Sequence, residues 1–366
     1  MIDINRIGSY YGSLQGKATL GLDGFVDEVW QVVKGRSSRT DYVLYEKMQD
    51  FAKTVYDVGK GGFANEILRK RRSYGGCVCN TGKAAGRLGS NPTFIGMFGE
   101  ETVDPVFREF QESYTLISVA DPAICQIFEF TDGKLMLPFM EETLDFNWEY
   151  LINSLPKDEL AKAMDSDIVS IGYWSQLTYF DELVTGLCEE FLIEGRCKRM
   201  FFDFADVRKR DKQSLERTLS VLAGLNKKMP MTLSLNEHEA GILFSYKGKS
   251  FDWEKPDEAE NDIEYVRQQT GLDELVIHTP YFAVAATANE GTAKVMQRFC
   301  EDPVITTGAG DNFNGGYLSA SLDAGKLNLR ERLFVGNAAT GFYIRNGYSP
   351  DKAELMIDMK KLIEAL

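Results

Sequence analysis

A short glycine-rich segment near the carboxyl end of the sequence carries the residue types best suited to chemistry. It places Gly308, Ala309, Gly310 and Asp311 in succession, followed by a stretch compatible with a helix. Small residues let the backbone turn tightly with its N–H groups facing one concavity, which can hold an anion. A helix that begins here would add its positive end to the same field.

Asp311 stands where this turn would end. Its carboxylate could take a proton from an attacking hydroxyl, while the N–H groups stabilise charge on a transferring phosphoryl group. An alternative interpretation is that Asp311 caps its own helix after a glycine-rich loop. The segment by itself favours the two interpretations equally.

A second segment has the composition of a ligand-binding turn. Gly75 and Gly76 would leave room for a ligand against the backbone, and Asn80 offers a donor and an acceptor to a hydroxylated substrate. Ala84, Ala85 and Gly86, a little further on, are better explained by close helix packing.

The elements that must position these segments alternate between strand-like and helix-like patterns. Strand-like runs begin at residues 18, 92, 167, 198, 231 and 274, with helix-compatible stretches between them. This alternation predicts parallel pairing in a layered α/β sheet. Residues 124–139 instead predict a hairpin that turns at Asp132-Gly133, as either an edge hairpin or a substrate lid. The pattern of residues 37–72 assigns no order of elements.

The composition argues against several classes of binding partner. The 366 residues carry a formal net charge of -14, which predicts no nonspecific binding to nucleic acid or to an anionic membrane. The basic run at 69–72 is predicted to be a solvated loop or helix end, with a phosphate-binding role as the less favoured alternative. Six scattered cysteines without a CxxC pair, and only two histidines, argue against a zinc site. The absence of a long apolar stretch predicts a cytoplasmic protein with reduced thiols.

Together, the two glycine segments resemble the two signatures of the PfkB, or ribokinase-like, carbohydrate kinase family. The resemblance spans most of the chain, in the expected order. Asp23 at the end of the first strand is similar to the family's substrate-binding aspartate, and Asn236 with Glu239 resembles its Asn-x-x-Glu motif. The match at 308–311, to the anion hole and catalytic aspartate, is the most specific.

The resemblance implies a ribokinase-like three-layer sandwich over residues 1–366, as one domain with a mostly parallel sheet and a small β lid that includes about 124–139. The lid strands could also form a homodimer, as in some relatives. Asp23 and Asn80 would bind substrate hydroxyls beside Gly75 and Gly76.

The resemblance also implies ATP and Mg²⁺ as cofactors. Asn236 and Glu239 would help to place the metal through water, because Mg²⁺ prefers oxygen ligands and keeps part of its hydration shell; capping of a helix start is the alternative role of this pair. Asn337 is a candidate nucleotide contact or an ordinary packed helix residue. Arg208 is a candidate phosphate or substrate contact or a surface arginine.

Two positions depart from the family pattern. Ile305 stands where relatives often have an aspartate, which argues against a monovalent-cation site that uses this carboxylate. Residues 278–282 replace a glycine-rich turn that relatives commonly have, so the nucleotide loop is expected to differ in shape.

These features predict an enzyme that transfers a phosphoryl group from ATP to a hydroxyl of a sugar or sugar-like molecule. Asp311 would be the base, and the backbone of Gly308, Ala309 and Gly310 would form the anion hole. A nucleoside kinase and a noncatalytic sugar-binding regulator on the same fold are the alternatives.

Overall fold

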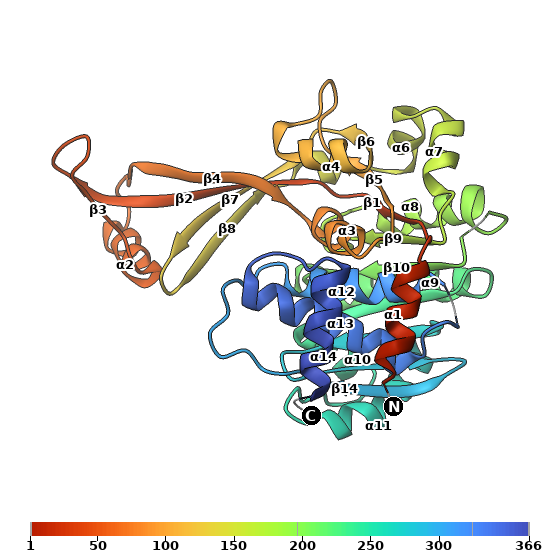
Figure 1. Cartoon of the computed structure of the whole chain (residues 1–366). Coiled ribbons are helices and arrows are strands. Elements are labelled where there is room, and N and C mark those ends of the chain that lie inside the picture. The colour runs from red at the N-terminus through yellow and green to blue at the C-terminus, as the bar shows by residue number, and fades with distance from the viewer. Residues whose placement is uncertain (1, 196, 324, 365–366) are drawn as a thin grey trace.

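A large sheet forms the body of the protein, and a second sheet projects from it as a lid (Figure 1). The computed structural model describes residues 2–195, 197–323 and 325–364. In spatial order, the nine body strands are β14 (Gly291–Met296), β13 (Phe282–Thr287), β12 (Glu274–His278), β11 (Met231–Asn236), β10 (Arg199–Asp203), β9 (Ile168–Gly172), β1 (Ala18–Gly21), β5 (Pro92–Met97) and β6 (Thr115–Ala120). The five lid strands are β2 (Phe25–Arg36), β3 (Tyr42–Leu44), β4 (Ile67–Gly75), β7 (Ala123–Phe130) and β8 (Gly133–Phe139).

Helices connect most of the body strands. The α-helices are α1 (Ile4–Ser13), α2 (Met48–Val58), α3 (Cys77–Arg87), α4 (Arg108–Ser113), α5 (Glu141–Leu144), α6 (Trp148–Ser154), α7 (Lys157–Met164), α8 (Phe180–Leu187), α9 (Lys212–Asn226), α10 (Glu237–Tyr246), α11 (Pro256–Thr270), α12 (Ala309–Ser321), α13 (Leu329–Asn346) and α14 (Lys352–Glu364). Short turns of other helix types are η1 (Pro105–Phe107), η2 (Cys188–Leu192) and η3 (Val207–Lys209).

Pairing is parallel from β12 through β11, β10, β9, β1 and β5 to β6. Among the strands of the body that the structure describes, only the edge formed by β12, β13 and β14 is antiparallel. The mostly parallel α/β sheet predicted from the alternation of elements is therefore confirmed. Parallel strands carry their carboxyl ends at one edge, which is where open α/β sheets bind ligands.

Two buried cores lie on opposite faces of the body sheet. Along β10, Met200 and Phe202 belong to one core, and Phe201, between them, belongs to the other. This alternation is the period of two that a strand requires, with both faces covered. Helices α6 to α11 cover the first face, and α1, α3, α12, α13 and α14 cover the second. The result is the three-layer sandwich that was predicted.

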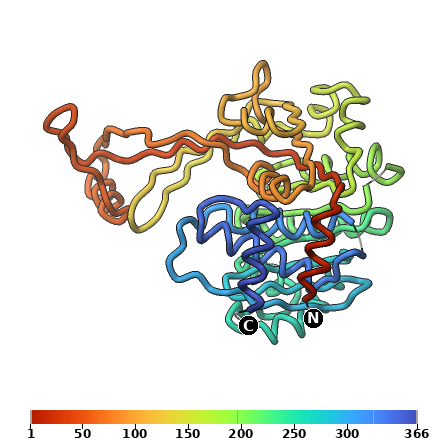
Figure 2. Tube along the Cα trace, in the orientation of Figure 1, coloured from red at the N-terminus to blue at the C-terminus, as the bar shows by residue number. Residues whose placement is uncertain are grey.

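The lid contains the hairpin predicted at 124–139, which is formed by β7 and β8. Strand β7 pairs in parallel with β2, and β2 also pairs with β3 and β4. The segment 37–72, which the sequence pattern could not order, supplies β3, α2 and most of β4. Figure 2 shows that the lid extends well away from the body.

Two local predictions for the lid were wrong. The basic run at 69–72 lies inside β4 rather than in a loop or helix end, because its charges have partners on other segments: Arg72 bonds Asp104, just before η1, at 2.7 Å, and Lys70 bonds Glu129 of β7, at 2.8 Å. The hairpin turns at 131–132, one residue earlier than predicted, since Gly133 already pairs with Phe130. The Asp132 carboxylate instead accepts the N–H of Met48, at 2.6 Å, at the start of α2.

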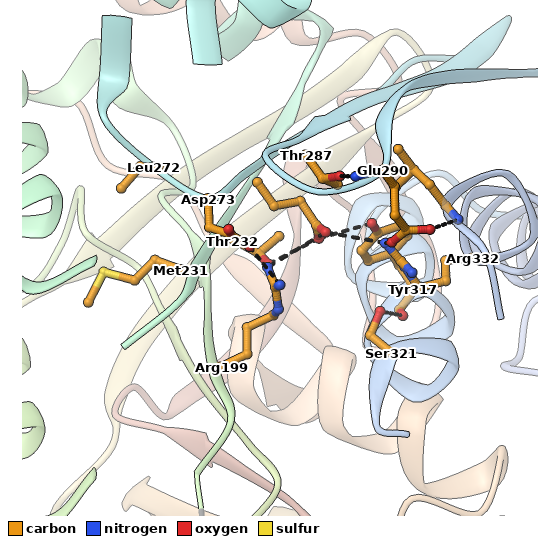
Figure 3. Close-up of polar contacts among 12 residues, drawn as sticks. Arg199, Met231, Thr232, Leu272, Asp273, Thr287, Glu290, Tyr317, Ser321 and Arg332 are labelled. Atoms are coloured by element: carbon orange, nitrogen blue, oxygen red, sulfur yellow. Dashed lines mark hydrogen bonds and ion pairs between the residues drawn. The ribbon is translucent and has the colours of Figure 1, made fainter. Parts of the chain in front are cut away.

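A buried ionic network fixes α12 against the sheet, at the strand ends opposite the lid (Figure 3). Glu274, at the start of β12, accepts a hydrogen bond from the Tyr317 hydroxyl, at 2.9 Å. Its other oxygen lies 3.4 Å from Arg332 of α13 and 3.6 Å from Arg199 of β10. Removing one member would leave a buried charge unpaired, so this network holds the two helices in one register.

All six cysteines lie within the described residues and are free thiols. In the same part of the chain, no helix combines the length and apolarity needed to cross a membrane.

Candidate active site

Helix α12 begins directly after the glycine-rich turn. Gly308 precedes it with a φ of 84°, a left-handed conformation that glycine adopts without steric cost. The Ala309 N–H is already used, because it donates to the Thr306 carbonyl at 3.1 Å. Within the described residues, the N–H groups of Gly310 and Asp311 have no acceptor. The available part of the anion hole is thus the first turn of the helix itself.

Hydrogen bonds from α13 and from the first turn of α12 hold the glycine-rich turn in place. The Thr340 hydroxyl donates to the Ala309 carbonyl, and the Tyr343 hydroxyl donates to the Thr307 carbonyl, each at 2.7 Å. The Asn312 side chain donates to the Gly308 carbonyl at 2.9 Å. These bonds consume carbonyl groups and leave the free N–H groups in place for an anion.

Close packing of α3 on α12 brings Thr81 to Asp311. A Cβ at Gly315 would lie 2.5 Å from the Ala84 side chain, so only glycine allows this approach. The Thr81 hydroxyl consequently donates to the Asp311 carboxylate at 3.3 Å. Ala84 and Ala85 are buried, which confirms their packing role. Thr81 was missed in the sequence because its role depends on the crossing of two helices.

Acidic groups crowd around Asp311. Ligand atoms of Cys77, Asp203 and Asp311 all lie within 4.8 Å of one another. Withdrawal from solvent, followed by repulsion from Asp203 and Asp23, raises the pKa of Asp311 well above its usual range. Asp203 itself accepts hydrogen bonds from the Ala205 N–H and the Asn314 side chain, both at 2.8 Å. A carboxylate with a raised pKa is suited to accept a proton near neutral pH.

Asp23 is 1% exposed and lies at the junction between β1 and the lid. One oxygen accepts the Val78 N–H at 3.1 Å, while the other is buried without a partner. Burial raises its pKa to about 7. The unsatisfied oxygen is the type of group that a substrate hydroxyl would satisfy.

The glycine pair makes room for two carboxylates. A Cβ at Gly76 would lie 2.2 Å from the free Asp23 oxygen, and Gly76 has a φ of 90°. Gly75 is similarly covered by the carboxylate of Asp27. A carboxylate oxygen therefore lies where the Cβ of a larger residue would be at each of the two positions. Asn80 is half-buried in the first turns of α3.

A cleft of about 840 Å³ opens beside Asp311. Of the predicted site residues, Ala309, Gly310, Asp311, Asn236 and Glu239 line it. Its other wall includes Thr279, Gln297, Phe299, Cys300, Thr340 and Ile344. Asp23, Gly75, Gly76, Asn80, Gly308 and Asn337 are not part of its lining.

Asn236 and Glu239 form a capping box at the start of α10, the alternative role considered for this pair. The Asn236 side-chain oxygen accepts the N–H groups of His238 and Glu239, and Glu239 accepts the Asn236 N–H at 3.0 Å. Burial, and then repulsion from Asp203, raise the pKa of Glu239 well above its usual range. Its remaining oxygen and the carboxylates of Asp203 and Asp311 line the same cleft and are oxygen donors of the kind that Mg²⁺ prefers.

Two further candidates have defined places. Arg208 lines the cleft but pairs with Asp206 at 2.7 Å. Asn337 is 4% exposed, and its amide donates to the Val295 carbonyl at 3.2 Å, so it supports β14 from behind the cleft.

The turn at 278–282 is organised by Thr279, whose hydroxyl accepts the N–H groups of Tyr281 and Phe282. His278 is withdrawn from solvent beneath Gly310, and burial lowers its pKa to about 4, so its ring is neutral. This turn therefore adds no positive charge under the anion hole.

Two residues of the lid also lie at this site. Met136 of β8 lines the cleft, and the Lys134 ammonium group lies 3.5 Å from the Thr307 hydroxyl, next to the anion hole. Neither residue stood out in the sequence, because only the folded hairpin brings them over the body.

Solved structures share this fold. Ribokinase from Thermotoga maritima superposes with a TM-score of 0.61 at 17% identity, covering 95% of this chain and 100% of the other. A phosphofructokinase-2 mutant from Escherichia coli gives a TM-score of 0.62 at 14% identity, covering 96% and 100%. The fold is therefore ribokinase-like, and the chain is a carbohydrate kinase of the PfkB class.

Sequence comparison assigns the chain to one family within the PfkB class of carbohydrate kinases. The family model described as prokaryotic ketohexokinase matches residues 12–361, so the chain belongs to that family. A ketohexokinase from Haloferax volcanii is 28% identical over 347 residues, which cover 93% of this chain and 90% of the relative.

Replacing Gly76 by alanine tests the space that Asp23 requires. We expect the free energy of unfolding to fall by about 2 kcal/mol or more, because the new Cβ meets a buried carboxylate at a positive φ. Chemical denaturation measures this change. The control is Gly224→Ala in α9, where nothing lies within 4 Å and helix propensity predicts a gain of up to about 1 kcal/mol. Equal stability of the two variants would contradict the assigned role of Gly76.

Proposed function

We propose that the protein transfers the γ-phosphoryl group of ATP to a hydroxyl of a ketohexose or a closely related sugar. One observation carries this proposal: Asp311 lies beside two free N–H groups at the start of α12 and lines a cleft large enough for a nucleotide. Membership of the ketohexokinase family and the ketohexokinase relative support the choice of sugar. Lid and body are proposed to act as one catalytic domain.

In this mechanism, Asp311 accepts the proton of the acceptor hydroxyl as its oxygen attacks phosphorus. The N–H groups of Gly310 and Asp311 stabilise the negative charge on the transferring group, and the turn that begins at Gly308 and Ala309 orients them. Asp23 and Asn80 bind other hydroxyls of the sugar. Positioning of the acceptor supplies much of the rate increase.

The nucleotide is proposed to occupy the wall of the cleft formed by Thr279, Phe299, Thr340 and Ile344. Asn337 contributes by supporting β14 rather than by direct contact. Glu239 and Asp203 would hold Mg²⁺, with Asn236 fixing Glu239 through the capping box; the metal, when bound, neutralises phosphate charge. Burial and repulsion from Asp203 raise the pKa of Glu239, and a bound cation would offset that repulsion.

A panel of acceptors with ATP and Mg²⁺, followed by release of ADP, tests the substrate class. We expect turnover with a ketohexose such as fructose and no turnover with nucleosides, since family membership favours the sugar. Preferential turnover of a nucleoside would replace the proposal with the nucleoside-kinase alternative. Sugar binding without any release of ADP would support a noncatalytic regulator.

The variant Asp311→Asn tests the base. We expect kcat to fall by roughly 10² to 10⁴, with a smaller change in the affinity for sugar, because asparagine keeps the shape but does not take up the proton. In the unchanged enzyme, kcat/KM should rise with pH as Asp311 loses its proton, in a range above that of an ordinary aspartate.

The matched control is Asp165→Asn, at an exposed position after α7. Thermal melting should show that both variants fold. Near-normal turnover of a folded Asp311→Asn variant would refute the assignment of the base.

The lid is also proposed to form a homodimer. Exposed apolar side chains gather on it, among them Val43, Leu137 and Phe139, which are 51–61% exposed. Light scattering should give about twice the 41.2 kDa of one chain. Leu137→Glu should return the mass to one chain, whereas Ile357→Glu on α14 should not. A monomeric unchanged protein would rule out this interface.

A further inference from the structure

A cysteine lies among the carboxylates of the candidate active site. Cys77 is the first residue of α3, and it packs against the end of β9 at Gly172. A Cβ at Gly172 would lie 3.0 Å from the Cβ of Cys77, so a glycine at this strand end leaves room for the cysteine. Cys77 lines the cleft together with Asp203 and Asp311. The proposed phosphoryl transfer gives its thiol no role.

Three possible metal ligands meet here from elements that are distant in sequence, which is why the spacing of the cysteines argued against a zinc site. The sulfur of Cys77 and one oxygen each of Asp203 and Asp311 lie within 4.8 Å of one another. Zn²⁺ binds sulfur at about 2.3 Å and carboxylate oxygen at roughly 2.0–2.2 Å, so ligands of a tetrahedral site stand roughly 3.5 Å apart. Small side-chain rotations would let these three atoms share one ion.

The two carboxylates are held in place but keep the capacity to bind a cation. Asp203 accepts the Ala205 N–H and the Asn314 amide, each at 2.8 Å. Asp311 accepts the Thr81 hydroxyl at 3.3 Å. An ionised carboxylate offers about four lone-pair positions, so both groups can accept a further partner. Both side chains are only partly buried, and an ion can therefore reach them from the cleft.

A small cavity adjoins this cluster and is an independent observation in favour of a bound ion. Its volume is about 10 Å³, and its lining includes Cys77, Thr81, Ser170 and Asp203. This is about the smallest volume that holds one water molecule. Cys77 and Asp203 line both the cavity and the cleft. The cluster thus has beside it a space of the size of a single small ion or water.

The charges around the thiol favour a cation. Burial, and then repulsion from Asp203, Asp311 and Asp23, raise the pKa of Cys77 well above its usual range. Asp23 is 1% exposed, and one of its oxygens has no partner. Without a metal the thiol is therefore protonated. A divalent cation would offset the repulsion among the carboxylates and stabilise the thiolate.

We propose that Cys77, Asp203 and Asp311 bind a thiophilic divalent metal ion of the Zn²⁺ type, and that this ion inhibits the kinase. When the metal binds, the Cys77 thiol releases its proton to solvent and its sulfur coordinates the ion. The sulfur distinguishes this site from the Mg²⁺ site proposed at Glu239 and Asp203, because Mg²⁺ prefers oxygen ligands.

Binding of the thiophilic metal goes beyond the proposed function, whereas inhibition rests on it. The ion would occupy an oxygen with which Asp311 accepts the proton of the acceptor hydroxyl. Because Asp203 belongs to both metal sites, the thiophilic ion and Mg²⁺ would also exclude each other. The site would therefore make the kinase sensitive to the concentration of free Zn²⁺.

The first test measures metal binding apart from activity. Protein freed of metal by a chelator is titrated with Zn²⁺ in equilibrium dialysis, and with Co²⁺ as a spectroscopic probe. We expect one bound ion per chain and an intense near-ultraviolet band from thiolate bound to Co²⁺. In Cys77→Ser the band should vanish and the affinity for Zn²⁺ should fall at least about tenfold, since loss of even a residue that supports a ligand costs this much.

The matched control is Cys300→Ser. Cys300 also lines the cleft but belongs to no cluster of metal ligands among the described residues. Its replacement should leave the affinity for Zn²⁺ and the Co²⁺ band unchanged. Thermal melting checks the fold of both variants.

X-ray absorption of the Zn²⁺-loaded unchanged protein gives an answer that needs no variant. One sulfur at about 2.3 Å from the metal, with oxygen in the remaining positions, would support the site. A shell of oxygen and nitrogen alone would overturn it. So would equal affinity for Zn²⁺ in Cys77→Ser and the unchanged protein.

Inhibition is measured with ATP, Mg²⁺ and the best acceptor, at free Zn²⁺ concentrations set by a metal buffer. Each variant is compared with its own activity in Mg²⁺ alone. The unchanged protein should be inhibited, and a chelator selective for Zn²⁺ should restore its activity. Cys77→Ser should need at least about tenfold more Zn²⁺ for the same inhibition.

The two measurements separate the possible failures. Binding of Zn²⁺ at Cys77 without loss of turnover would overturn the inhibitory role. A protein that shows the thiolate band but phosphorylates no acceptor would contradict the proposed function and support the metal site.

Discussion

Carboxylates brought together at the carboxyl edge of the parallel sheet are the feature on which the rest of the site depends. Asp203 ends β10, Asp23 follows β1, and Asp311 opens α12, and each is withdrawn from water beside the others. Their repulsion costs folding free energy that the ionic network around Glu274 and the two cores must offset. The same repulsion favours binding of a cation, of hydroxyl groups that donate hydrogen bonds, and of a proton. The arrangement that prepares this edge for chemistry therefore lowers the stability of the fold.

The surrounding elements keep this arrangement in place. Gly315 lets α3 approach α12, which places Thr81 on Asp311. Gly75 and Gly76 give space to two carboxylates, and hydrogen bonds from Thr340 and Tyr343 of α13 fix the glycine-rich turn before α12. The lid adds Lys134 and Met136 from above. Small residues and hydrogen bonds to carbonyl groups do most of this positioning.

The fold was predictable because alternating strands and helices leave few ways to bury both faces of a sheet. The residues of Gly308 to Asp311 were also predictable, since a glycine-rich turn before a helix has a local physical meaning. The positions of Thr81 beside Asp311 and of Lys134 beside Thr307 were not, because they come from contacts between elements distant in sequence. The basic run at 69–72 was misjudged for the same reason: its partners, Asp104 and Glu129, are supplied by other segments.

The most direct measurement is a crystal structure of the protein with its acceptor sugar, Mg²⁺ and a nonhydrolysable ATP analogue. The account predicts that one sugar hydroxyl lies within hydrogen-bonding distance of the Asp311 carboxylate and points to the terminal phosphate. That phosphate should accept the N–H groups of Gly310 and Asp311. A sugar bound away from Asp311, or a terminal phosphate that does not reach the start of α12, would contradict it.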